Sequence, residues 1–287
     1  MAVTGTGTVG DPYIVTTWED FLSVAIGDVY IKCADNCVWD FNEIAPEGVS
    51  NIVLKFLNWD GNGVKIMNLA HRNPNDTTKF GISFGEGSAD NTTREIKNIN
   101  FLNCYLNSNY YGNEAQALFK FIGNYIISNS TFSVYSANGV VFGCSTARSA
   151  GFPQFRRCSL TIYAYGNSCF TCQRQSGYYF DFVDCKLNFD GISNQKMDHF
   201  AYVFFENSKV VGKIPYGTMN LRVNTSVIDA EIRDNSRITS IIIAITLINS
   251  DKIGDNVTFS GNLTQVTSEE LKDVSALQQK GFPIVSG

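Results

Sequence analysis

Proline, histidine and charge are scarce in this chain of 287 residues, which has 6 Pro, 2 His and 17% charged residues. Lys and Arg are scattered singly and the net charge is −5, so no basic surface is expected to neutralise the phosphates of a nucleic acid. The most apolar stretch, 241–248, is as long as a strand and too short to span a bilayer. We therefore expect neither a nucleic-acid partner nor a membrane partner.

Signals for export, cofactors and metals are also weak. Met1 to Gly7 holds no basic segment and no apolar core, so we expect synthesis in a cytoplasm and reduced cysteines at all eight positions. Gly5, Gly7 and Gly10 match a dinucleotide fingerprint, but no strand precedes them and no βαβ unit follows. Cys169 and Cys172 have metal-like spacing without two further ligands nearby, so neither a metal nor another cofactor is predicted.

A short motif recurs about every 25 residues along most of the chain. It has a large apolar residue, then Asn or Asp two positions later, then Cys or Ser, as in Phe101-Leu-Asn103-Cys104-Tyr-Leu106. Further copies begin at 127, 155, 182 and 205, and weaker ones at 223 and 247. The small residue falls at 104, 130, 158, 185, 208, 226 and 250, giving intervals of 26, 28, 27, 23, 18 and 24.

The spacing within the motif requires a bend. Side chains along a strand alternate between its two faces, so residues three apart share a core only if the chain turns between them. Asn and Asp tolerate the left-handed backbone of such a turn. Each copy therefore predicts strand, bend, strand, with an Asn ladder at the bends and a column of buried Cys and Ser beside it. The predicted bends are Asn103, Asn129, Asp184, Asn207 and Asn249.

The fold class predicted from this pattern is all-β, a single-stranded right-handed parallel β-helix with short terminal capping helices; the handedness follows the preference of parallel crossovers. Thr17 precedes an amphipathic segment, 18–25, that suits a capping helix, and Ser268 begins a second helix ending near Lys280. We predict an N-terminal cap over 1–27, the β-helix over 28–265, and a C-terminal capping helix and tail over 266–287.

Additional strands are expected between the motifs, at 118–121, 140–142, 178–182, 202–205 and 241–245. The 45 residues from Asn58 to Asn103 hold either one repeat with a long loop or two repeats.

The ends of the chain carry a resemblance. Gly5-Thr-Gly-Thr-Val-Gly-Asp-Pro-Tyr-Ile-Val15 with the helix after Thr17 resembles the N-terminal cap of right-handed β-helix proteins of the pectin-lyase-like class. Leu271-Lys-Asp273 with Gly281-Phe-Pro-Ile284 is similar to endings of β-helix proteins of bacteriophages and prophages. The class includes pectate lyases, polygalacturonases, tailspike depolymerases and non-enzymatic virion and adhesive proteins, so the resemblance implies fold more than activity.

Carboxylates are the candidates for chemistry. Glycoside hydrolysis needs two of them, about 6.5–9.5 Å apart in inverting enzymes. No catalytic motif of polygalacturonases or pectate lyases is present, so no catalytic residue is assigned. If the chain is an enzyme, the candidate acids are Asp181, Asp184, Asp198 and Glu206. Asp184 has a second explanation, because Asp is favoured at a bend and stands one repeat from Arg157.

Tyrosines expected to face outward are the candidates for binding. Tyr105 lies between the inward-facing Cys104 and Leu106, so its ring should point to solvent. Exposed aromatic residues mark contact surfaces and could stack on sugars or pack against protein; the alternative is that loops half-bury them. The candidates are Tyr105, Tyr110, Tyr111, Tyr135, Tyr163 and Tyr165.

The expected function is that of a non-enzymatic structural component of a bacteriophage particle: an appendage, a fibre- or spike-like protein, or a decoration protein. Its localisation would be the virion, and its partners other virion proteins, a host surface polysaccharide and further copies of itself in a trimer. Two alternatives stay open, a tailspike-type polysaccharide depolymerase and a glycan-binding adhesin.

Overall fold

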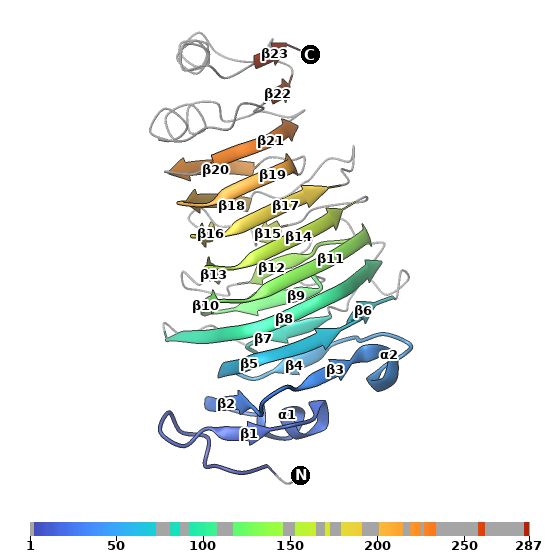
Figure 1. Ribbon diagram of the computed structural model, residues 1–287, viewed down its shortest axis with the longest axis vertical. Helices are drawn as coiled ribbons and strands as arrows, with labels where there is room; N and C mark the ends of the chain where they lie inside the picture. Colours follow the sequence, from blue (N-terminus) through green and yellow to red (C-terminus); the bar gives the residue numbers. More distant parts are fainter. Residues whose placement is uncertain are drawn as a thin grey trace.

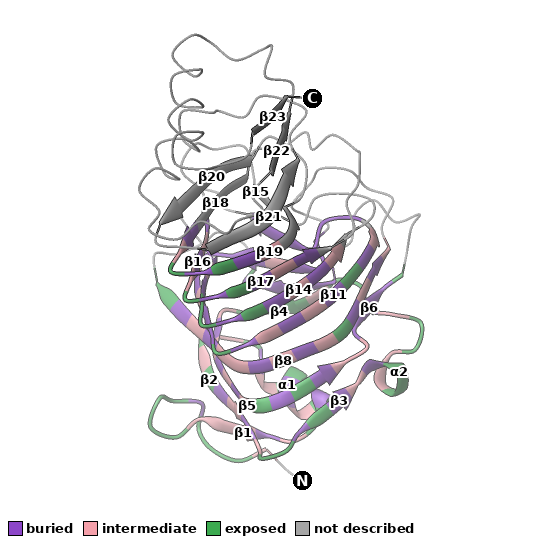
Figure 2. Cartoon of the chain, turned by 45° about the horizontal axis from the view of Figure 1, so that its top comes forward, coloured by how far each residue is buried: buried purple, intermediate pink, exposed green. Residues whose placement is uncertain are grey.

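Parallel β-structure dominates the computed structural model (Figure 1). The structure describes residues 3–72, 81–86, 92–107, 117–145, 153–164, 170–172, 179–190, 201–214, 219–224, 227–233, 258–261 and 284–286. All strand pairings among them are parallel, and the antiparallel contacts are two isolated bridges near the N-terminus. The all-β class is therefore confirmed, as a long curled parallel sheet compatible with a β-helix-like fold (Figure 2).

The strands stack in three groups. Ladder one contains β10 (Asn124–Ser128), β13 (Pro153–Arg156), β16 (Tyr179–Val183), β18 (Ala201–Glu206) and β20 (Met219–Asn224). Ladder two contains β11 (Thr131–Asn138), β14 (Ser159–Ala164), β17 (Lys186–Asp190), β19 (Lys209–Ile214), β21 (Val227–Arg233), β22 (Thr258–Gly261) and β23 (Ile284–Ser286). A separate five-stranded sheet contains β4 (Ile52–Leu54), β7 (Ile82–Phe84), β9 (Phe119–Ile122), β12 (Phe142–Ser145) and β15 (Phe170–Cys172).

Nearer the N-terminus the two ladders merge. The long strands β5 (Leu57–Met67) and β8 (Thr93–Asn107) run through the bend, so both ladders belong to one sheet of 18 strands. This sheet continues through β1 (Tyr13–Val15), β2 (Val29–Cys33), β3 (Val38–Asp40) and β6 (Ala70–His71). Trp59 pairs directly with Ile96, so a single repeat with a long connection lies between Asn58 and Asn103.

The sequence period reappears as strand register. Along ladder two, Thr131 pairs with Ser159, Ser159 with Lys186, Lys186 with Lys209, and Lys209 with Val227, which are steps of 28, 27, 23 and 18 residues. These steps equal the spacings of the small residue from 130 to 226. The motif therefore marks successive repeats of one stack over that part of the chain.

The predicted bends are confirmed where they are described. Asn103, Asn129, Asp184 and Asn207 all have φ between 45° and 55°, the left-handed conformation that Asn and Asp tolerate. Arg157 adopts the same conformation at φ 53°. Asn249 lies outside the described residues.

The first copy of the motif was assigned to the wrong register. Phe132 pairs with Phe101, a step of 31 residues, and after a register shift Val134 rather than Ser130 pairs with Cys104, a step of 30 residues instead of the predicted 26. The residue equivalent to Asn129 is Asn98, with φ 56°, and the Ile99 amide that follows it donates to Ser130 Oγ at 3.2 Å. The error arose because β8 contains two Asn bends five residues apart, and Asn103 matched the motif better.

The column beside the bends is polar for a reason that the sequence motif does not show. Cys185 Sγ accepts a hydrogen bond from the Cys158 amide at 3.4 Å and contacts the Phe155 carbonyl oxygen at 3.3 Å. Ser208 Oγ repeats the pattern one repeat later, with the Cys185 amide at 3.0 Å and the Phe182 carbonyl at 3.1 Å. The bend interrupts direct backbone pairing, so each thiol or hydroxyl accepts from a buried amide that has no backbone partner and also contacts a carbonyl oxygen.

We expect Cys185→Ser to change the free energy of unfolding by less than about 1 kcal/mol and Cys185→Val to lower it by about 1–3 kcal/mol. Serine keeps a donor and an acceptor, whereas valine has neither and leaves the Cys158 amide without a hydrogen-bond acceptor. Urea unfolding of both variants measures the difference; equal stabilities would show that size alone matters in this column.

The cysteines whose side chains the structure describes are buried, and five of them are free. Cys33, Cys37, Cys104, Cys158 and Cys185 are free thiols. Burial raises the pKa of Cys33 to about 12 and that of Cys104 further, which keeps both protonated and unreactive. The prediction that every cysteine is reduced is wrong for Cys144, which is disulfide-bonded. Its register neighbour on the five-stranded sheet is Cys172, whose side chain lies outside the described set.

The core is built from aligned apolar columns. The inward column of ladder one runs Ile31, Trp59, Ile96, Ile127, Phe155, Phe182 and Phe205, each in register with the next. Phe155 and Phe182 stack at 5.0 Å between ring centroids. Burial alternates along the strands of ladder two, as the bands of colour in Figure 2 show, whereas β7 is buried at all three of its residues. Ladder two therefore has a clear outer face.

The N-terminal end is capped as predicted. Helix α1 (Trp18–Val24) begins at Thr17, whose side chain accepts from the Asp20 amide in a capping box. Trp18 and Phe21 are buried against Trp39 and Trp59 in an aromatic cluster that closes the core. A second short helix, α2 (Phe41–Ile44), was not predicted. The predicted helix from Ser268 to Lys280 lies outside the described residues, and β23, in the predicted tail, extends ladder two.

Candidate functional site

The outer face of ladder two carries three columns of side chains, which we call the ladder-two face. Strand alternation places them outward, between buried columns such as Phe132, Leu160 and Leu187. The first column, next to the bend, is Lys65, Asn100, Thr131, Ser159, Lys186 and Lys209. The second is Ser133, Thr161, Asn188 and Val211, and the third is Tyr105, Tyr135 and Tyr163, followed in register by Asp190.

Three of the six predicted binding tyrosines therefore lie together. The rings of Tyr105 and Tyr135 stack with centroids 5.8 Å apart and planes 7° apart, and Tyr163 is the register partner of Tyr135. Tyr135 is 44% exposed, the most exposed aromatic residue in the described part of the chain. Tyr110, Tyr111 and Tyr165 lie outside the described residues, so their prediction is untested.

Stacking changes what the tyrosine column can offer a ligand. Tyr135 covers one side of Tyr105, and the Arg72 guanidinium, from the preceding repeat, lies 5.8 Å from the Tyr105 ring centroid. A sugar ring therefore cannot lie flat on Tyr105. The column instead presents ring edges and phenol hydroxyls, which can pack against and hydrogen-bond to a partner rich in hydroxyl groups. Arg72 could not be predicted as part of this column, because it lies outside the repeating motif.

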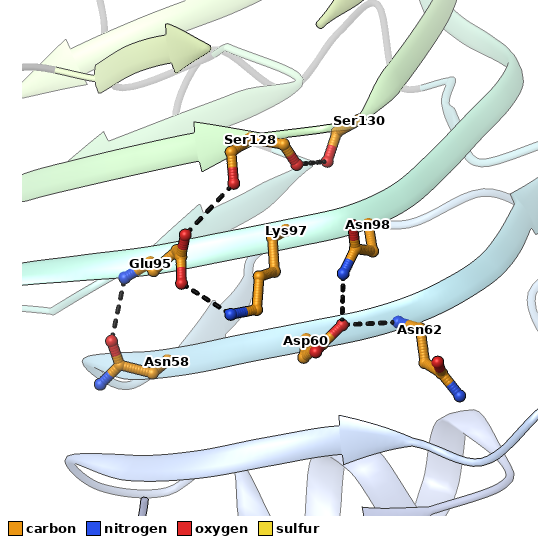
Figure 3. A network of polar contacts seen from close by, with 8 residues as sticks. All are labelled: Asn58, Asp60, Asn62, Glu95, Lys97, Asn98, Ser128 and Ser130. Carbon is orange, nitrogen blue, oxygen red and sulfur yellow. Dashed lines mark hydrogen bonds and ion pairs between the residues drawn. The ribbon is translucent and has the colours of Figure 1, made fainter. Parts of the chain in front are cut away.

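The outer face of ladder one holds a different, self-satisfied polar network (Figure 3). Glu95 accepts from Lys97 Nζ at 2.9 Å and from Ser128 Oγ at 3.3 Å, while its amide donates to Asn58 Oδ1 at 2.9 Å. The hydrogen bond to Glu95 raises the pKa of Lys97, which favours its charged form. Asp60 accepts from the Asn98 side chain and the Asn62 amide, both at 2.9 Å. The hydrogen bonds of Asp60 and Glu95 therefore connect neighbouring repeats.

The predicted acids lie further along the same face. Asp181 is half-buried; burial, followed by the charge of Glu206, raises its pKa, while Arg156 and a 3.4 Å hydrogen bond from Gln154 oppose the shift. Asp184 is exposed at its bend and accepts from the Asn207 amide group. No ion pair joins it to Arg157 in the described structure. Asp198 lies outside the described residues, so Asp181 and Glu206 are the predicted acids that the fold brings into electrostatic contact.

The described residues provide no other recognised site. They hold no group of three or more His, Cys, Asp or Glu side chains placed to bind a metal. No described helix is long and apolar enough to cross a membrane. No protein-family model, curated protein or solved structure matches the chain. Function must therefore be argued from the outer faces themselves.

Proposed function

We propose that the chain is a right-handed parallel β-helix that serves as a non-enzymatic structural module of a bacteriophage particle. Its ladder-two face would be the surface presented to a partner, a host surface polysaccharide or another virion protein, and copies would associate as a trimer. The tyrosine column of Tyr105, Tyr135 and Tyr163 carries the binding part of this proposal, because aligned phenols on a rigid sheet form a regular, partly apolar and partly hydrogen-bonding edge. The virion assignment rests on the chain's ends and their resemblance to phage proteins.

One observation favours a second candidate, a polysaccharide depolymerase. The raised pKa of Asp181 beside Glu206 is the pattern of a general acid paired with a second carboxylate. Against this candidate, Asp181 already takes part in a chain of side-chain hydrogen bonds. Gln154 donates to Asp181, and the Arg156 guanidinium donates to Gln154 Oε1 at 2.9 Å. A structural explanation of the shift is therefore sufficient.

Binding by the ladder-two face is tested by removing its two stacked rings. We expect the double variant Tyr105→Ala and Tyr135→Ala to bind bacterial surface polysaccharide at least ~10-fold more weakly than the unchanged protein, since about 1.4 kcal/mol of contact is a tenfold loss. The measurement is biolayer interferometry on immobilised capsular polysaccharides and lipopolysaccharide O-chains. Tyr30→Ala, a half-exposed tyrosine on the ladder-one face, is the matched control. Equal binding by the double variant and the control, or binding to no polymer, would contradict the proposal.

A further inference from the structure

The lysines of the ladder-two face are not neutralised. Lys186 and Lys209 are register partners on β17 and β19, and both side chains are exposed. Adjacent parallel strands lie about 4.8 Å apart, so the two ammonium groups leave the sheet side by side. Like charges placed directly opposite each other destabilise a sheet. No ion pair joins either lysine to a carboxylate in the described structure.

The column that holds the pair contains no carboxylate. The rest of the first column is Lys65, Asn100, Thr131 and Ser159, and the second column opens with Ser133, Thr161 and Asn188, so no carboxylate lies in either up to Lys209. Further along the same face, Asp190 continues the third column after Tyr163, and Asp229 continues the second column after Val211. The acids Asp60, Glu95, Asp181 and Glu206 face outward from ladder one instead. The Lys186–Lys209 pair therefore has no carboxylate in its own column up to Lys209, and the acids of the same face lie two or more residues further along their strands.

The first column and the tyrosine column border one continuous polar surface. Ser159 and Tyr163 are four residues apart on β14, so about 13 Å of strand separates the two columns. Between them lie Thr161 and its register partners, with small side chains that offer hydroxyl and amide groups. Cations at one edge, hydrogen-bonding groups in the middle and phenols at the other edge match a ligand that has many hydroxyls and a few negative charges.

We propose that the ladder-two face binds an acidic polysaccharide, with Lys186 and Lys209 together holding its carboxylate or sulfate groups and the tyrosine column contacting its sugar hydroxyls. This inference rests on the proposed binding function and adds the chemical class of the ligand. A nucleic acid is the less suitable polyanion, because it carries a phosphate at every nucleotide and this face offers three lysines in one column.

The test compares retention on immobilised heparin, a sulfated polysaccharide, with retention on uncharged dextran. We expect the unchanged protein to be retained by heparin in about 50 mM NaCl and released before about 1 M, where the screening length falls to about 3 Å. The variant Lys186→Gln and Lys209→Gln should pass through at the lower salt. The control Lys32→Gln and Arg156→Gln removes the same charge from the ladder-one face and should elute with the unchanged protein.

Three results would overturn the inference: passage of the unchanged protein through heparin, equal loss of retention in the control, or tighter binding of an immobilised dT20 oligonucleotide than of heparin. The variant Tyr105→Ala and Tyr135→Ala separates the two proposals. Suppose the lysine variant binds capsular polymers as well as the unchanged protein does, while the tyrosine variant does not bind them. The ladder-two face would then bind an uncharged polysaccharide, so the proposed acidic ligand would be wrong and the proposed binding function would stand.

Discussion

Replacing Phe155 by alanine is expected to lower the free energy of unfolding by about 3–5 kcal/mol, the cost of emptying a large aromatic site in a packed core. Phe155 has no exposed surface and lies in the middle of the inward column of ladder one. Its ring contacts Phe142 at 5.4 Å and Phe182 at 5.0 Å between centroids, so it joins the five-stranded sheet to the long sheet.

Urea unfolding followed by circular dichroism measures this effect. Phe155→Leu should lose only about 1–2 kcal/mol because it refills most of the volume, and the surface control Tyr30→Ala should lose less than about 1 kcal/mol. A loss below about 1 kcal/mol for Phe155→Ala would mean that the two sheets do not share a core at this position.

Removing the carboxylate of Asp28 is expected to lower the free energy of unfolding by about 2–4 kcal/mol, because it takes a bidentate carboxylate partner away from a buried guanidinium. Arg94 is 2% exposed at an inward position of β8, and its Nε and terminal nitrogen each bond Asp28 at 3.1 Å. Its guanidinium also lies 4.4 Å from the Phe56 ring centroid. Because Asp28 is half exposed, solvent screens its attraction to Arg94, and the expected loss of stability is smaller than that for a fully buried ion pair.

A double-mutant cycle tests the pair. Asp28→Ala together with Arg94→Met should be more stable than Asp28→Ala alone, because the buried charge that has lost its carboxylate is gone and an apolar side chain fills the site. Thermal unfolding of the single and double variants gives the coupling. Additive losses would show that Arg94 and Asp28 do not depend on each other.

Most of the architecture could be predicted from local chemistry. Asn and Asp at the bends, with a small residue after them, determined the repeat from Asn129 to Asn207, and the register steps agree. The prediction failed where two bends lie close together, at Asn98 and Asn103, since both satisfy the same backbone preference. Contacts such as Arg94 with Asp28 could not be predicted, because they join positions 66 residues apart with no periodic signal.

Part of the candidate site could also be predicted from the local pattern of the sequence. Alternation along a strand sufficed to place Tyr105 outward, and register then brought Tyr135 and Tyr163 beside it. The pairing of Lys186 with Lys209 follows from the same register. Whether the two charges can bind an anion depends on the positions of nearby carboxylates, which the motif alone does not predict. Asp181 and Glu206 were proposed from chain proximity, and the structure adds their electrostatic coupling.

Whether the protein binds polysaccharide without cutting it is tested most directly by following polymer length during binding. Purified capsular polysaccharide that the protein retains would be incubated with it, and new reducing ends and unsaturated products would be measured over time. Our account predicts a bound polymer of unchanged length, with the same result for Asp181→Asn. Sustained cleavage that Asp181→Asn abolishes would contradict the structural function and establish the carboxylates of the ladder-one face as an active site.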